Sequence, residues 1–300
     1  MREIAEEGLQ ESLSIYDLDL FFNHPVRYLL QKRLNLFLEQ DQNQVEDRET
    51  FILNPLQKFQ LAQTLLKFGR TGGNLGDFFS HARESGVLPH GSVGDVIFRD
   101  TSVETESFIE TIAQYARGDC ASPLDVDLKL EGVTLRGELT HIYESGLVHV
   151  RYARIKAKYV LATWICHLIY CVSGVSARPL KSCLIGTDAV WEFKPVNQGG
   201  RLLQFLIALY RRGLSTPIHF FPESAFVYAL KRIIQDQSKE SARAAALNKW
   251  LGSDFARGES EDPYYDLCFR DSQPPLDDVF IKNAMDVFEP LLQYGHKTEL

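Results

Sequence analysis

Two carboxylates and an ammonium alternate along the short stretch PLDVDLK, as Asp125, Asp127 and Lys129. Carboxylates bind Mg²⁺, which can activate a water for phosphodiester hydrolysis and stabilise the charged transition state. The stretch therefore holds the groups that a metal-dependent nuclease needs. Alternate side chains of a strand share one face, so Asp127 and Lys129 fit the exposed face of a solvated strand equally well.

A basic set consisting of Arg151, Arg154, Lys156 and Lys158 lies between an expected strand and an expected helix. These cations are suited to contact DNA phosphates, and they are equally consistent with a plain solvated face. The whole chain has a formal net charge of −8 at pH 7. Proteins that bind DNA unaided are usually basic, because phosphate contacts supply much of their affinity. We therefore expect any contact with DNA to be local.

The positions of apolar residues predict a mixed α/β chain. Helical spacing and capping residues predict helices at 14–23, 25–34, 54–69, 74–86, from 103 to about 118, 159–173, 199–213, 223–235, 241–251, 264–269 and 276–292. Alternation over 124–155, broken at 131–132 and 144–146, predicts a three-stranded antiparallel meander. One or two further strands are expected within 179–196, and the polar stretch 39–50 is expected to be a mobile loop.

Several classes of protein and site are disfavoured. The amino-terminal residues have no apolar segment typical of a signal peptide, and the longest apolar run, 159–172, is too short to span a bilayer. We therefore expect a cytoplasmic protein without a membrane partner. The five cysteines lack clustered spacing, which favours reduced thiols over a metal centre. His141, His149 and His167 are expected to be hydrogen-bonded or solvent-facing, so we predict no metal site and no cofactor.

The stretch RGELTHIYESGLVHVRYARIK resembles the catalytic hairpin of the PD-(D/E)XK nuclease superfamily, in its RecB-like branch. In that family the first strand carries G-x-x-D, the second carries D-Y-K, and the next helix closes the site. Gly137 matches the glycine and Tyr152 matches the tyrosine. Thr140 falls at the metal-binding aspartate, Arg151 at the second acid and Ala153 at the lysine. The resemblance implies a restriction-endonuclease-like core whose catalytic groups have been replaced.

These replacements remove the chemistry that the resemblance would otherwise imply. Thr140 offers a neutral hydroxyl, and Arg151 places a permanent positive charge where a metal cation would bind. Ala153 removes the ammonium. Arg151 is instead suited to hold a phosphate.

Other motifs narrow the resemblance. The stretch 13–36 resembles the entry helix of RecB-like nucleases, with His24 in place of a cysteine, and Lys58 falls at or near the family's metal-binding histidine. The stretches 199–230 and 262–292 resemble the C-terminal domain family of RecC, the gamma subunit of exodeoxyribonuclease V. The similarity extends from about residue 13 to residue 292.

The resemblance implies a non-catalytic scaffold within a RecBCD-type helicase–nuclease, with RecB, RecD and duplex or forked DNA as partners. It also implies a flexible segment at 1–12 and one domain over 13–300. That domain would have a pseudo-nuclease core at 124–196 and helical additions at 13–120 and 197–300. Two alternatives stay open. The chain could be an active Mg²⁺-dependent nuclease with a displaced site formed by Asp125, Asp127, Lys129 and Glu138, or a free-standing DNA-binding module.

Overall fold

The computed structural model describes residues 12–38, 53–130, 132–174, 178–254, 256–270 and 274–300. Contacts divide the chain into two compact units. Described residues 12–38 and those from 118 onward belong to the first unit, and 53–117 belong to the second. The expected mobile loop at 39–50 and the first eleven residues of the expected flexible segment lie outside the described residues.

The first unit contains both larger sheets. Its strands are β1 (Ser12–Ser14), β2 (Leu124–Leu130), β3 (Val133–Leu139), β4 (Ile142–Tyr143), β5 (Gly146–Val150), β6 (Ser182–Ile185), β7 (Ala189–Phe193), β8 (Gly252–Ser253), β9 (Ala256–Arg257) and β10 (Gly295–Glu299). Its helices are α1 (Ile15–Asn23), α2 (Pro25–Tyr28), a π-helical turn η1 (Leu29–Arg33), α6 (Ala157–Ser173), α7 (Gly199–Gly213), α8 (Pro222–Ile233), α9 (Lys239–Leu251), the 3₁₀ turn η3 (Glu259–Glu261), α10 (Pro263–Phe269) and α11 (Asp278–Tyr294).

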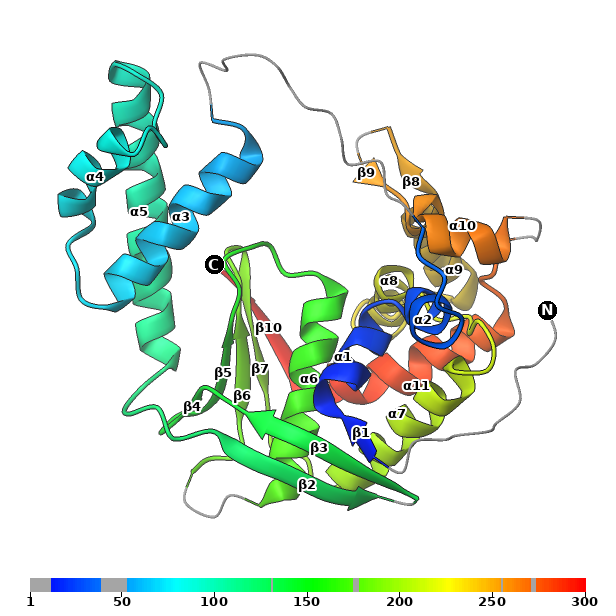
Figure 1. Cartoon of the computed structure of the whole chain (residues 1–300). Helices are drawn as coiled ribbons and strands as arrows, with labels where there is room; N and C mark the ends of the chain where they lie inside the picture. Colours follow the sequence, from blue (N-terminus) through cyan, green and yellow to red (C-terminus); the bar gives the residue numbers. More distant parts are fainter. Residues whose placement is uncertain (1–11, 39–52, 131, 175–177, 255, 271–273) are drawn as a thin grey trace. The chain divides into compact units, whose positions relative to one another are not determined.

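The strands are arranged in two main sheets (Figure 1). One sheet has the order β1-β3-β2, in which β3 pairs antiparallel with β2 and parallel with β1. The other has the order β10-β7-β6-β5-β4, in which only β5 and β6 are parallel. Helix α6 connects these two parallel strands, as a parallel pair requires. These mixed sheets and many helices confirm the mixed α/β class.

The predicted three-stranded meander is wrong at its third strand. β2 and β3 form the expected antiparallel hairpin, but β5 pairs with β4 and β6 in the other sheet. The chain leaves the first sheet at His141, whose φ of 61° lies in the left-handed region and interrupts an extended strand. The alternation of apolar residues continues across this break, so it did not reveal the change of sheet.

Helix α6 forms the centre of the first unit. Most of its residues are apolar. Five of its side chains are each at most 1% exposed: Trp164, Ile165, Leu168, Ile169 and Tyr170. A helix that is apolar around most of its circumference must be buried on more than one side. It packs against β5, β6 and β7 as well as against α1, α7 and α8. Its left-handed C-cap at Gly174, with φ 62°, confirms the predicted helix end.

The second unit consists of α3 (Pro55–Arg70), the 3₁₀ turn η2 (Leu75–Phe78), α4 (Phe79–Glu84) and α5 (Ser92–Tyr115). Asn54 caps α3 as predicted: its side chain accepts from the Gln57 amide at 2.8 Å. Helix α5 begins eleven residues before the predicted start at 103, since Ser92 already lies in the helix. Gly94 weakened the sequence signal there, yet only a glycine fits beside the Pro89 carbonyl, which a Cβ would approach to 2.1 Å.

Among the described residues, no helix is both long enough and apolar enough to cross a membrane.

Candidate nucleic-acid interface

Thr140 directly follows β3 and Arg151 directly follows β5, but these strands belong to different sheets and do not form the predicted hairpin. The residue after Thr140 contacts the middle of β5, because the His141 carbonyl accepts a hydrogen bond from the Val148 amide at 3.0 Å. Thr140 Oγ1 lies 2.9 Å from His141 Nδ1. The Ala153 amide donates to the Arg151 carbonyl at 2.7 Å, so the chain turns at once after β5. A hydroxyl therefore follows β3 in one sheet, and a guanidinium follows β5 in the other.

The Arg151 guanidinium lies over an aromatic ring rather than extending freely. Its Cζ is 5.0 Å from the centroid of the Tyr159 ring in the first turn of α6, and Lys158 Nζ lies 5.3 Å from the same centroid. Both cations are attracted by the negative face of the ring. They are therefore held together at the start of α6.

Asp19 on α1 supplies the negative charge of this region. The side chain is only partly exposed, and burial raises the pKa of its carboxyl while the charges of Arg151 and Lys158 act to lower it. We call Asp19, Arg151, Lys158 and Tyr159 the Arg151 cluster. Sequence reasoning missed Asp19, although an acid within the apolar run Leu18–Phe22 was a usable signal.

His149 lies beside the cluster and remains neutral. Burial, together with the charges of His141 and Arg151, lowers the pKa of its imidazole to about 4. Its Nδ1 lies 3.2 Å from Thr163 Oγ1 on α6. His149 is therefore a hydrogen-bonded, uncharged side chain next to two cations.

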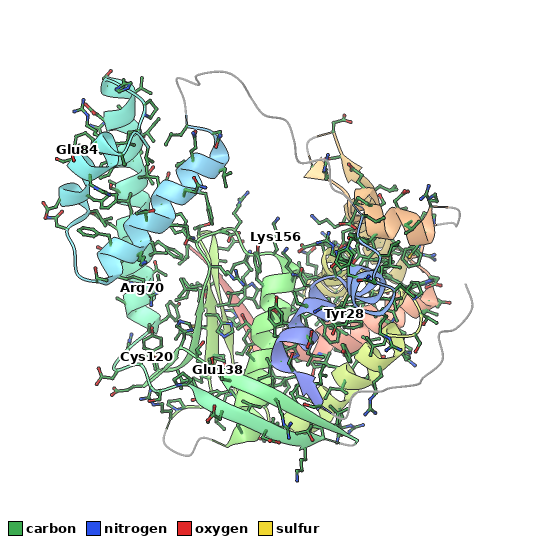
Figure 2. The ribbon with its side chains drawn as sticks, in the orientation of Figure 1. Tyr28, Arg70, Glu84, Cys120, Glu138 and Lys156 are labelled. Atoms are coloured by element: carbon green, nitrogen blue, oxygen red, sulfur yellow. The ribbon has the colours of Figure 1, made fainter. Side chains whose placement is uncertain are left out.

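The two other basic candidates point to separate places. Arg154 is exposed, and its Nε lies 4.0 Å from Asp188 Oδ2. Lys156 lies at the start of α6 (Figure 2). Its side chain makes no capping hydrogen bond to this helix. The four predicted cations thus follow one another along the chain, but only Arg151 and Lys158 share a contact.

Lys58, the fourth position expected to have lost a metal ligand, lies in the second unit. Its Nζ is 3.2 Å from both carboxylate oxygens of Glu104 on α5. The side chain therefore has an exposed ion-pair partner within its own unit.

The alternative site lies on the exposed face of the β2–β3 hairpin, where Asp125, Asp127, Lys129 and Glu138 are all exposed. Asp125 is the cross-strand partner of Glu138. Asp127 pairs instead with Arg136, whose Nε lies 3.3 Å from its carboxylate, with both side chains 60% exposed. We call these five residues the β2–β3 face. They have the exposure expected for a solvated strand.

The remaining histidines and the cysteines have ordinary surroundings. His167 is buried, with Nδ1 2.8 Å from Ser182 Oγ and Nε2 2.9 Å from the Lys194 carbonyl. A carbonyl only accepts, so Nε2 carries the proton and Nδ1 accepts from the serine. His141 is exposed, and all five cysteines are free thiols. Within the described ranges, no group of three or more histidine, cysteine or acidic side chains is placed to hold a metal ion.

His24, which was expected to stand where RecB-like nucleases have a cysteine, joins two parts of the chain that are far apart in sequence. Its Nδ1 accepts from the Arg27 amide at 3.2 Å, while Nε2 lies 2.9 Å from Asp262 Oδ1. Arg27 binds the other carboxylate oxygen at 2.7 Å. Burial lowers the pKa of His24. For Asp262, burial acts to raise the pKa, but hydrogen bonds and the charges of His24 and Arg27 lower it to about 2.

The fold defines a mixed α/β chain in which a hydroxyl follows β3 and a guanidinium follows β5. Residues 10–233 match the family described as RecC C-terminal domain. The match covers more than half of the chain, and the chain therefore belongs to this family.

Curated relatives agree with this assignment. The chain is 26% identical to the RecBCD enzyme subunit RecC of Escherichia coli (strain K12) over 301 residues, covering 96% of this chain and 26% of that protein. It is 28% identical to the same subunit of Haemophilus influenzae over 262 residues, covering 85% of this chain and 23% of that protein. The relative from Buchnera aphidicola (subsp. Acyrthosiphon pisum) is 25% identical over 88% of this chain and 25% of its own length. The chain thus spans about a quarter of the curated relatives it matches.

Proposed function

We propose that the chain is a non-catalytic scaffold and DNA-guiding domain of a RecBCD-type helicase–nuclease, acting in double-strand-break repair and in degradation of linear DNA. Its partners in this proposal are the RecB and RecD subunits, with RecD in direct contact, together with duplex or forked DNA entering the complex. Relatives named as RecC subunits of the RecBCD enzyme support it. Catalysis would belong to RecB and to the motor subunits, and the complex would act in the cytoplasm.

We infer a degenerate PD-(D/E)XK core at 124–196 within one domain over 13–300. The order of elements supports the core: a hairpin of β2 and β3 is followed by β5, by helix α6 and by β6 parallel to β5. Thr140, Arg151 and Ala153 stand at the positions where the family places its metal ligands and lysine, and Lys58 is proposed to be a fourth lost position. A hydroxyl and a guanidinium do not bind Mg²⁺ in the way that carboxylates do.

The observation that carries the proposal is the position of Arg151, at the end of β5 and over the Tyr159 ring. A guanidinium held in place loses less freedom when it binds a phosphate. Lys158 beside it and the exposed Arg154 and Lys156 would extend the contact along the DNA backbone. The formal net charge of −8 fits a domain that meets DNA together with partner subunits rather than alone.

An incubation of the purified chain with linear duplex DNA and Mg²⁺ or Mn²⁺ tests the non-catalytic part. We expect no cleavage above that of a metal-free control. Cleavage that disappears in Asp127→Ala or Glu138→Ala would contradict the proposal and would assign an active nuclease to the β2–β3 face. Arg136→Gln is the matched control, because it changes the same face without removing an acid.

A binding titration with forked DNA tests the scaffold part. We expect binding to the chain with RecD to be tighter than binding to the chain alone. Equal, salt-dependent binding with and without RecD would support a free-standing DNA-binding module instead.

A further inference from the structure

A cavity of about 320 Å³ lies beside the proposed phosphate contacts, within the first unit. Its wall is formed by the junction of α1 and α2, the residues that begin α6, the first turn of α8, and the segment from β9 through η3 to α10. This volume is within the usual range for small-ligand sites. Lys156 and Lys158 line it, so the cavity and the basic set meet at the start of α6.

Two of the basic groups that line the cavity are already paired. Arg27 binds Asp262 at 2.7 Å, and Arg257 Nε lies 3.9 Å from Glu261. Lys156 and Lys158, by contrast, have no carboxylate oxygen within 4.0 Å among the described residues, although the charge of Lys158 acts on Asp19 and its ammonium lies over the Tyr159 ring. The cavity thus has a pair of ammonium groups available to an anion.

Two helices of eight or more residues begin at the cavity, and only one of them has a side-chain cap. The carboxylate of Glu259 accepts from the Glu223 and Ser224 amides at the start of α8, at 3.1 and 2.7 Å. Helix α6, which follows Lys156, has no such cap. Its free amide groups and positive dipole end favour an anion there, as the two lysines do.

Tyr265 gives an independent indication of a ligand. The residue is 2% exposed, its ring stacks on His24 at 4.0 Å between centroids, and its hydroxyl has no hydrogen-bond partner among the described residues. Burial, together with the charges of Glu259 and Asp262, raises the pKa of this hydroxyl, which therefore keeps its proton. A buried hydroxyl without a partner is costly, and the cost is removed when a bound group supplies one.

Glu223 also has an oxygen without a hydrogen-bond partner in the described part of the chain. Its Oε1 is buried and unbonded among the described residues, and Glu223 lines the same cavity. A carboxylate oxygen accepts from N–H and O–H donors. The cavity therefore offers cations to an anion, and an acceptor and a hydroxyl to a polar group.

We propose that this cavity binds a single unpaired nucleotide, with its phosphate at Lys156, Lys158 and the amino end of α6, and with an exocyclic amino group of its base at Glu223 and Tyr265. Carboxylates recognise such amino groups, as in the readout of cytosine N4. This inference rests on the proposed function, because it states which part of an unpaired DNA strand the DNA-guiding domain would bind. It adds discrimination between bases to a contact otherwise made to phosphates.

Isothermal titration of the chain with dCMP, dUMP and inorganic phosphate tests the inference. dCMP and dUMP differ in the amino group and the matching ring nitrogen, so we expect dCMP to bind about tenfold more tightly than dUMP. Phosphate should bind more weakly than either. Equal affinity for the two nucleotides, or phosphate binding as tight as dCMP binding, would overturn the proposal. Tighter binding of N-acetylargininamide than of dCMP would also overturn it, because the cavity would then suit a basic side chain of a partner protein.

Three variants assign the two ends of the ligand. Tyr265→Phe should lower dCMP affinity about fivefold while the fold becomes no less stable, since it removes a buried hydroxyl that has no partner. Glu223→Gln should abolish the preference for dCMP over dUMP. Lys158→Gln should lower the affinities for dCMP and dUMP by the same factor. Lys282→Gln, at an exposed position on α11, is the matched control and should change nothing. Unchanged dCMP binding in folded Tyr265→Phe and Glu223→Gln would refute the site.

Failure of this inference is distinguishable from failure of the proposed function. If duplex DNA did not bind through Arg151 and Arg154 but dCMP still bound in the cavity, only the proposed function would be contradicted. Normal duplex contact without dCMP binding would count against the cavity alone.

Discussion

Charged side chains of the first unit have different environments in the Arg151 cluster and on the β2–β3 face. In the cluster, two cations lie over one aromatic ring and share the partly buried Asp19. On the β2–β3 face, the acids and bases are exposed to solvent, and both side chains of the Asp127–Arg136 pair are 60% exposed. Lys156 at the start of α6 and Glu138 on β3 mark the two places, which are well separated in Figure 2. The residues that match a nuclease motif, Asp125, Asp127 and Lys129, are exposed to solvent. A match in sequence therefore predicts a functional site less well than the structural surroundings of the residues do.

The largest expected effect is on stability, and it differs between a glycine of the β4–β5 hairpin and a glycine of the β2–β3 hairpin. Gly146, which begins β5, has φ 122°, and a Cβ there would lie 2.3 Å from the Lys181 carbonyl oxygen. We expect Gly146→Ala to lower the free energy of unfolding by at least about 3 kcal/mol, through backbone strain and a clash with backbone. Denaturant unfolding followed by circular dichroism measures this change.

Gly132, in the turn of the β2–β3 hairpin, is the control for that change. It has φ 70°, but the nearest atom to an added Cβ is the end of the Arg211 side chain at 3.3 Å. Gly132→Ala should therefore cost only about 1 kcal/mol. Equal losses for the two variants would show that the close packing of β5 against its neighbours is not what distinguishes the hairpins.

The next effect concerns pH and His149. Its folded pKa of about 4 lies below the ordinary 6.5, so between these values the folded state holds fewer protons than the unfolded state. Stability should rise with pH across this window, by up to about 1.4 kcal/mol per pH unit from this one group, and be lost as pH falls to about 4. His149→Gln should remove this part of the slope. Thr163→Val, which keeps the imidazole, should retain a positive slope, and a His149→Gln slope equal to that of the wild type would contradict the assignment.

A smaller effect is expected from the acid in the Arg151 cluster. Asp19→Asn removes the carboxylate that competes with a phosphate for Arg151 and Lys158, so affinity for forked DNA at low salt should rise about fivefold. Fluorescence anisotropy with RecD present measures this gain. Asp127→Asn on the β2–β3 face is the matched control, and the same gain there would mean that only net charge matters.

The smallest expected effect is that of the aromatic ring. Tyr159→Leu keeps an apolar side chain but removes the ring face under both cations, which should cost about 0.5–1 kcal/mol of stability. A double-mutant cycle with Arg151→Gln should give a coupling of similar size. No coupling in that cycle would show that the guanidinium is not held by the ring.

Local patterns predicted several elements well. The apolar spacing and glycines at both ends predicted α7 at its observed bounds, and Gly174 ended α6 as expected. These signals are local, because caps and helical periodicity act within a few residues of the chain.

Two strands that depend on distant partners were not predicted. β10 is an exposed strand of polar sequence, GHKTE, which is extended because it pairs with β7 about a hundred residues earlier. The strand β1 likewise exists through its pairing with β3. At the candidate site, the sequence identified Arg151 and Lys158 but not Asp19, since α1 meets α6 only in the folded chain. The bond from His24 to Asp262 also joins residues with no local relationship.

The salt dependence of binding to forked DNA, measured with RecD present, tests the central claim most directly. That claim is that the Arg151 cluster holds a phosphate where active relatives would hold a metal. The double variant Arg151→Gln/Lys158→Gln should reduce the magnitude of the slope of log K against log salt concentration by about two, because two phosphate contacts are lost. The pair Lys129→Gln/Arg136→Gln on the β2–β3 face should leave the slope unchanged. An unchanged slope in the first variant, with a reduced slope in the second, would contradict the account.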